Sequence, residues 1–221
     1  MVLQKLLGSY INILLPSSCA ACGKSLAAYP LPVCPRCLRL ILAKNPPAIQ
    51  SSNHLKKIWS CRPYEDVVRE CIKKFKYREK RHMMIVFENM IRKFLSENNL
   101  PSDPVDLIVP VPLHPIRRHA RGYNQSELIS EALSGRFSAP VCSHALIKTK
   151  NTVPQMGLSR KNRIKNLKNS FAVVDRLYLV GKSILLVDDI MTTGATLDTC
   201  AVTLLGAGVK EVFAFTLART L

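Results

Sequence analysis

The feature that most restricts the fold is the run SILLVDDI at residues 183–190, where four consecutive apolar residues lead into two adjacent aspartates. An apolar run without alternation is typical of a strand that helices cover on both faces, as in a parallel sheet. A helix is predicted after it, from Thr196 to Leu205, followed by a second apolar strand, EVFAFTLA, at 211–218. This strand–helix–strand order predicts an α/β domain.

The residues before this run, from 105 onward, continue the alternation of strands and helices. They read as a strand at 105–113, a helix at 124–137, a strand at 143–149 and a short strand at 170–174. Such an order predicts a doubly wound parallel sheet, with ligands bound at the carboxyl ends of its strands.

Further upstream, helical periodicity is visible in YEDVVRECIKKFKY and again in MMIVFENMIRKFLSEN. The interval before them contains two prolines and many polar residues, and is expected to be a linker. We therefore expect an N-terminal module at 1–45, a linker at 46–60 and the α/β domain at 61–221.

Four of the eight cysteines form two CxxC pairs, Cys19 with Cys22 and Cys34 with Cys37. Two such pairs separated by a short Pro-containing segment are typical of a tetrahedral thiolate zinc site. Because all four positions would be thiolates, the Zn²⁺ would be structural. Disulfides or a remnant without metal are the alternatives.

The first 19 residues are apolar enough to resemble a targeting signal, and LPSSC resembles a lipoprotein cleavage site. Leucines at helical spacing, with Gln4, Lys5 and Asn12 between them, favour an amphipathic helix that packs on the domain. No segment reaches transmembrane length, so we expect a cytoplasmic protein, with a place at the inner face of the membrane as the alternative.

The two aspartates and the loop after them predict a ribose-phosphate site. A helix N-terminus that follows glycine and small hydroxyl residues presents free N–H groups to an anion. Carboxylates beside such a phosphate site are suited to accept hydrogen bonds from vicinal hydroxyls, directly or through Mg²⁺ and water.

The stretch ILLVDDIMTTGATL at 184–197 resembles the phosphoribosyl-diphosphate (PRPP) motif of type I phosphoribosyltransferases. The resemblance implies that Asp188 and Asp189 bind the ribose hydroxyls. It also implies a 5-phosphate cradle, made by Thr192, Thr193, Gly194, Ala195 and Thr196. Mg²⁺ is then expected to accompany PRPP.

Two longer blocks, VPVPLHPIRRHARGYNQSELI at 109–129 and TKNTVPQMGLSRKNRIKNLKNSF at 149–171, are similar to the ComF/ComFC family. That family implies a role in DNA uptake during natural transformation, with the competence DNA-transport machinery as partner. Basic residues in the two blocks are candidates for contacts with the diphosphate or for a mobile loop: Arg117, Arg118, Arg121, Arg160, Lys161 and Arg163.

The net charge of +17 predicts attraction to polyanions. A basic helix at 65–81, with Phe75 and Tyr77 among lysines and arginines, is a candidate for binding single-stranded DNA, although a solvated helix face explains the same pattern. Two functions therefore remain: a ribose-phosphate-binding accessory of DNA uptake, or a metabolic phosphoribosyltransferase. No acceptor-binding element is recognisable in the sequence.

Overall fold

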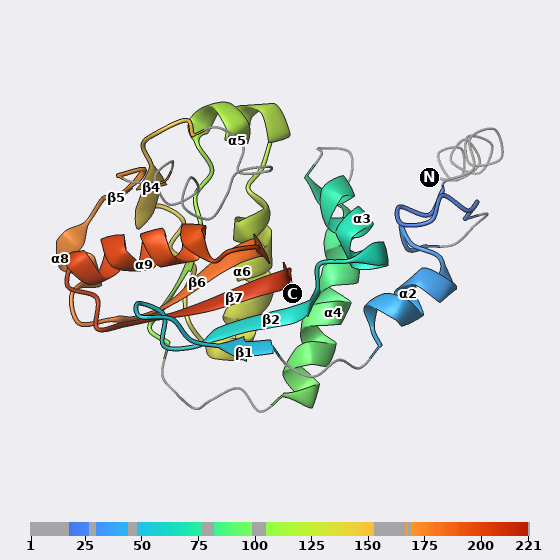
Figure 1. The fold of residues 1–221 in the computed structure, drawn as a ribbon, viewed down its shortest axis with the longest axis horizontal. Helices are drawn as coiled ribbons and strands as arrows, with labels where there is room; N and C mark the ends of the chain where they lie inside the picture. Colours follow the sequence, from blue (N-terminus) through green and yellow to red (C-terminus); the bar gives the residue numbers. More distant parts are fainter. Residues whose placement is uncertain are drawn as a thin grey trace, which may run out of the picture.

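The protein is built on a five-stranded sheet with the strand order β1-β2-β7-β6-β3 (Figure 1). The computed structural model describes residues 18–26, 30–43, 48–76, 82–98, 105–152, 167 and 169–220. Four strands are parallel and β1 is antiparallel to β2 at one edge. The strands are β1 (Ala48–Gln50), β2 (Ile58–Pro63), β3 (Leu107–Pro110), β6 (Ser183–Met191) and β7 (Glu211–Arg219). The predicted α/β class with a parallel sheet is confirmed.

Helices cover both faces of the sheet, which explains the apolar runs in its central strands. Because side chains alternate along a strand, each strand feeds two cores. Leu185 and Phe213 pack on one side with α3 (Asp66–Phe75), α4 (Met84–Glu97) and α6 (Gln125–Phe137). On the other side, Leu186 and Ala214 pack against α9 (Ala195–Gly206), which crosses the front of the sheet in Figure 1.

The expected helix at 124–137 is α6, and the expected helix from Thr196 is α9. Asn124 caps α6, because its side chain accepts a hydrogen bond from the Ser126 N–H at 3.2 Å. The strands expected at 183–190 and 211–218 are β6 and β7. Periodicity and turn residues were therefore sufficient to locate the elements that carry the site.

The segment expected to be a linker, 46–60, instead supplies β1 and the first half of β2. Trp59 of β2 is 2% exposed and its ring stacks on Phe213 of β7, with the ring centroids 5.8 Å apart. The turn between the two strands is held on α9, where the Asp198 carboxylate is 2.9 Å from His54 Nδ1. The prolines and polar residues around these short strands masked their pattern in the sequence.

The structure also differs from the sequence-based expectation between β3 and β6. The strand expected at 143–149 does not join the parallel sheet, because β4 (Leu146–Lys148) pairs antiparallel with β5 (Phe171–Val173) in a separate two-stranded sheet. The structure also contains two short helices that were not predicted, α5 (Pro115–Arg121) after β3 and α8 (Arg176–Leu179) before β6.

The N-terminal module lies beside α3 (Figure 1). Its helix α2 (Pro35–Ile41) begins directly after Cys34, with Pro35 at the first helical position. Cys37 and Ile41 belong to the same core cluster as Ile72 of α3. The expected N-terminal helix falls at residues 1–17, outside the described residues. Within the described part of the chain, no helix combines the length and the hydropathy needed to cross a bilayer.

Candidate functional site

The two aspartates lie near the carboxyl end of β6 and differ in their surroundings. Asp188 is partly buried, and its Oδ1 accepts hydrogen bonds from the Asp189 N–H at 2.8 Å and from Ser126 Oγ at 3.2 Å. Burial, and next the neighbouring Asp189 charge, raise the pKa of Asp188 to about 7. At neutral pH this carboxyl group therefore exchanges readily between its charged and its protonated form.

Asp189 is 8% exposed, and its Oδ2 lies 2.9 Å from Lys76 Nζ at the end of α3. Burial lowers the pKa of Lys76, but the Asp189 charge and their hydrogen bond outweigh it, so the pKa is raised overall. The sequence had placed Lys76 only on a basic helix face. Lys76 and Asp189 are more than 100 positions apart in the sequence, so no local pattern could predict their contact.

The loop after the aspartates forms the N-terminus of α9. Gly194 is the N-cap residue with φ of 76°, a left-handed conformation that suits glycine, and the neighbouring Thr193 Oγ1 accepts a long hydrogen bond, 3.5 Å, from the Ala195 N–H. Thr220 holds the loop from the end of β7, since its N–H donates to the Met191 carbonyl at 2.9 Å and its Oγ1 to the Thr192 carbonyl at 3.2 Å.

Asp188 and this loop face the same hollow in the surface. Its other lining residues are Ile190, Met191, Thr192, Gly194, Ala195, Thr196 and Leu197. A carboxylate and a helix N-terminus therefore line the same small hollow, where a single ligand can contact both. Asp189 does not line this hollow, so the two neighbouring acids do not have equivalent positions.

The basic candidates on α5 divide into two groups. Arg118 forms a two-point ion pair with Glu127, with N–O distances of 2.6 and 3.0 Å. Arg121 donates to Gln125 Oε1 at 3.0 Å, and Arg117 to the Thr152 carbonyl at 2.6 Å. Arg160, Lys161 and Arg163 fall outside the described residues.

Four cations, Lys76, Arg117, Arg121 and Lys148, interact electrostatically with one another, and Lys76 and Lys148 also interact with the acid pair. Burial, and next the Arg121 charge, lower the pKa of Arg117. Burial, and next the Arg117 charge, lower the pKa of Lys148, whereas the Asp188 charge acts to raise it. Arg121 in turn acts on Lys76. Two acids and four cations give the site a surplus of about two positive charges, which favours an anionic ligand.

The four N-terminal cysteines come together as predicted. Their sulfur atoms all lie within 4.8 Å of one another, and Cys22 Sγ and Cys34 Sγ are 3.8 Å apart. That distance is the edge of a tetrahedron with metal–sulfur bonds of about 2.3 Å. All eight cysteines are free thiols, so the disulfide alternative is not realised in this structure.

Backbone N–H groups approach the cysteine sulfurs. The Cys34 N–H lies 3.3 Å from Cys19 Sγ. Although burial opposes it, N–H groups of Cys22, Cys34 and Ala21 lower the pKa of Cys19 to about 6. A thiolate is the form that binds metal. A backbone N–H of Cys37 lowers the pKa of Cys34 as well, whereas burial raises the pKa of Cys37. The four sulfur positions therefore fit a Zn²⁺ ion in their geometry.

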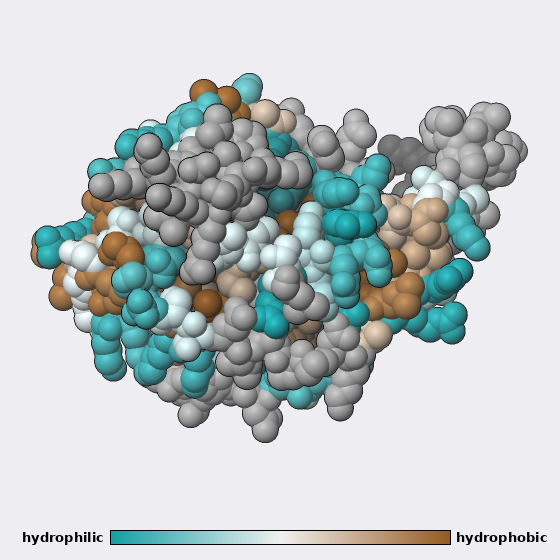
Figure 2. Space-filling model, viewed as in Figure 1, coloured by the Kyte–Doolittle hydropathy of each residue, from teal (hydrophilic) through white to brown (hydrophobic). Residues whose placement is uncertain are grey.

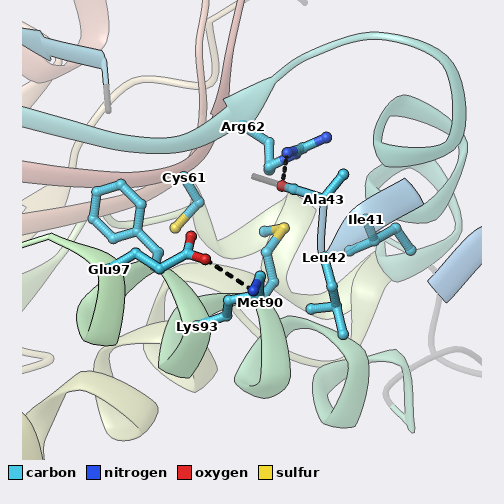
Figure 3. A pocket seen from close by; sticks show the side chains of 9 residues that line it. Ile41, Leu42, Ala43, Cys61, Arg62, Met90, Lys93 and Glu97 are labelled. Carbon is cyan, nitrogen blue, oxygen red and sulfur yellow. Dashed lines mark hydrogen bonds and ion pairs between the residues drawn. The ribbon is translucent and has the colours of Figure 1, made fainter. Parts of the chain in front are cut away.

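A separate hollow lies between the N-terminal module, β2 and α4 (Figure 3). There Arg62 of β2 donates to the Ala43 carbonyl, and at 3.0 Å to the Leu40 carbonyl beyond it. Lys93 pairs with Glu97 along α4 at 2.8 Å. Because Arg62 of β2 donates to carbonyl groups at the end of α2, these hydrogen bonds attach the N-terminal module to the sheet.

Known relatives point to one family, although no family model matches the chain. Competence protein F of Haemophilus influenzae is 40% identical over 115 residues, and the chain spans only half the length of that relative. DNA utilization protein YhgH of Salmonella typhi is 30% identical over 207 residues, or 93% of this chain and 85% of that one. Competence protein ComFC of Bacillus subtilis is 30% identical over 173 residues, or 78% and 68%.

Among solved structures, glutamine phosphoribosylpyrophosphate amidotransferase from B. subtilis is similar to 55% of this chain over 23% of its own length. The two are 21% identical over that part, with a TM-score of 0.34. At this level of similarity, the fold is assigned from the sheet topology described above.

Proposed function

Since the chain belongs to the family of competence and DNA-utilization proteins that includes ComFC, we propose that it acts in DNA uptake and binds PRPP or another ribose 5-phosphate. One observation supports the ligand above the others, namely that Asp188 and the N-terminus of α9 line the same hollow. A ribose 5-phosphate has vicinal hydroxyls for a carboxylate and a phosphate for a helix N-terminus, at the two ends of one sugar.

Each part of the site has a task in this proposal. The N–H groups at the start of α9 and the loop hydroxyls take the 5-phosphate, and Asp188 accepts hydrogen bonds from the ribose. Arg117, Arg121 and Lys148 face the diphosphate and offset its charge. Mg²⁺, when it arrives with PRPP, neutralises the diphosphate further.

Isothermal titration of PRPP in the presence of Mg²⁺ tests this proposal directly. We expect saturable binding, and a weaker response to ribose 5-phosphate, which lacks the diphosphate. Absence of PRPP binding would refute the proposed ligand.

Pyrophosphate release with a panel of nucleobases separates the binding protein from the metabolic transferase. We expect binding without turnover. Turnover with any base would instead establish the alternative, an active phosphoribosyltransferase.

Binding of single-stranded DNA is a second part of the proposal, which the net charge of +17 supports. The basic helix contributes less to it than its sequence suggested. Phe75 is fully buried and Lys76 pairs with Asp189, while Tyr77 falls outside the described residues. Base stacking by Phe75 is therefore ruled out as the mode of contact.

Fluorescence anisotropy of a labelled oligonucleotide at increasing salt measures this binding. We expect log K to fall linearly with log salt, as counterion release requires. No binding at low salt would refute DNA binding by this chain.

For the N-terminal module we propose a structural Zn²⁺ held by Cys19, Cys22, Cys34 and Cys37. All four coordination positions would be protein thiolates, so the ion would contribute folding energy and no chemistry.

A further inference from the structure

We propose that Lys76 is a built-in counter-ion that keeps divalent cations away from the Asp188–Asp189 pair until an anionic ligand arrives. This inference rests on the proposed ligand only in its last step, the arrival of the anion. Its basis is the ion pair between Lys76 Nζ and Asp189 Oδ2, which are 2.9 Å apart.

Packing of the preceding residue in the core fixes the position of Lys76, in contrast to that of a mobile surface lysine. The preceding residue, Phe75, is fully buried, and its ring packs against Phe87 and Tyr123 at centroid distances of 5.0 and 5.9 Å. The Phe75 carbonyl also accepts a hydrogen bond from the Tyr123 hydroxyl. The last turn of α3 is thereby anchored, and the ammonium group is delivered to the acid pair.

The pair is also shielded from solvent. The Lys76 side chain is 29% exposed and that of Asp189 is 12% exposed. An ammonium group removed from water remains charged here because a carboxylate faces it. In turn, the Lys76 charge neutralises that of the Asp189 carboxylate, so no net charge remains there to attract a metal ion.

Two adjacent carboxylates would otherwise be an attractive place for Mg²⁺ or Mn²⁺, which are bound by oxygen ligands. In this protein one carboxylate is neutralised by Lys76. The charge of the other acts on Lys148, next to which Arg117 and then Arg121 add further positive charge. A free divalent cation is repelled, whereas a phosphate or diphosphate is attracted. The site therefore binds the anion first, or the metal already complexed to it.

Titration of Mn²⁺ into the zinc-loaded protein, followed by electron paramagnetic resonance without PRPP, tests this role. We expect weak binding to the wild type and at least about tenfold tighter binding to Lys76→Met, because one opposing charge has been removed. Lys76→Arg should behave as the wild type. Adding Asp189→Asn to Lys76→Met should abolish the gain.

Lys74→Met is the matched control, because Lys74 is an exposed lysine on the same helix. Equal Mn²⁺ affinity in Lys76→Met and Lys74→Met would overturn the proposal. A purely structural role would lower stability but would not tighten metal binding. If Lys76→Met does not fold, Lys76→Gln, which keeps a hydrogen-bond donor for Asp189, is titrated in its place.

The two proposals fail separately in these experiments. No PRPP enters the Mn²⁺ titration, so its outcome does not depend on the identity of the ligand. A wild type that fails to bind PRPP, while Lys76→Met gains Mn²⁺ affinity, would refute the ligand and retain the counter-ion.

Discussion

Replacing Asp188 by asparagine should weaken PRPP binding about a hundredfold and at the same time stabilise the protein at alkaline pH. Asparagine offers one carbonyl oxygen in place of a carboxylate, so hydrogen bonds from the ribose hydroxyls weaken by about 2–3 kcal/mol, or about a hundredfold in affinity. The side-chain oxygen that accepts from the Asp189 N–H and from Ser126 is retained. Isothermal titration with PRPP measures the loss.

The gain in stability follows from the raised pKa of Asp188, about 7 against 3.8 in a model compound. Above pH 7 the group is charged in both the folded and the unfolded state, and its burial destabilises the fold. That destabilisation disappears as the pH falls from 7 towards 4, because the folded state binds the proton first. Because Asp188 is partly exposed, we expect Asp188→Asn to be more stable by about 2 kcal/mol at pH 8.

Urea unfolding at pH 8 and pH 5 measures this difference, which should be large at the higher pH and small at the lower. Asp175→Asn is the control, because Asp175 is an exposed helix cap that asparagine can replace. Undiminished PRPP affinity in Asp188→Asn would contradict the site, and identical unfolding curves at pH 8 would contradict the raised pKa.

The second large effect is expected from loss of the proposed Zn²⁺. Cys34→Ser should bind no Zn²⁺ at this site, because one of four thiolates is missing. We expect the free energy of unfolding to fall by at least about 3 kcal/mol, and the Tm by about 6–12 °C for a chain of this size. Metal analysis and thermal melting measure the two quantities.

Hydrogen exchange should locate the damage in residues 18–43 and in α3, which share a core cluster. Cys71→Ala is the control, since Cys71 is fully buried in that cluster but is not one of the four clustered cysteines. It should lose stability and keep a full complement of zinc. A wild type that is purified without zinc and melts like Cys34→Ser would refute the metal site.

The sequence was most informative where local chemistry and position coincide. The apolar run of β6, the glycine that caps α9 and the two CxxC pairs depend on residues close together in the chain, so their arrangement could be predicted. The same local reasoning correctly predicted that Asp188 and Asp189 lie near the carboxyl end of β6.

What could not be predicted depends on contacts between distant segments. Strand β2 follows a polar segment, and its pairing with β7 and β1, which are distant or irregular in the sequence, places it in the sheet. Lys76 looks like one of many surface lysines until Asp189 is brought beside it. Arg118 sits in a promising basic block but is held by Glu127. In each case tertiary structure decided between roles that the local sequence left open.

The pairing of β2 with β7 also determines where the chain can be divided. Residues of β7 between Val212 and Ala218 are all buried, and β2 covers the edge of that strand. A fragment that begins after Pro63 would expose one backbone edge of this buried, mostly apolar strand, while β6 still pairs with the other edge, and such an exposed edge is a template for aggregation. Strand β2 therefore protects this edge of the sheet, and the segment before it carries the cysteine cluster.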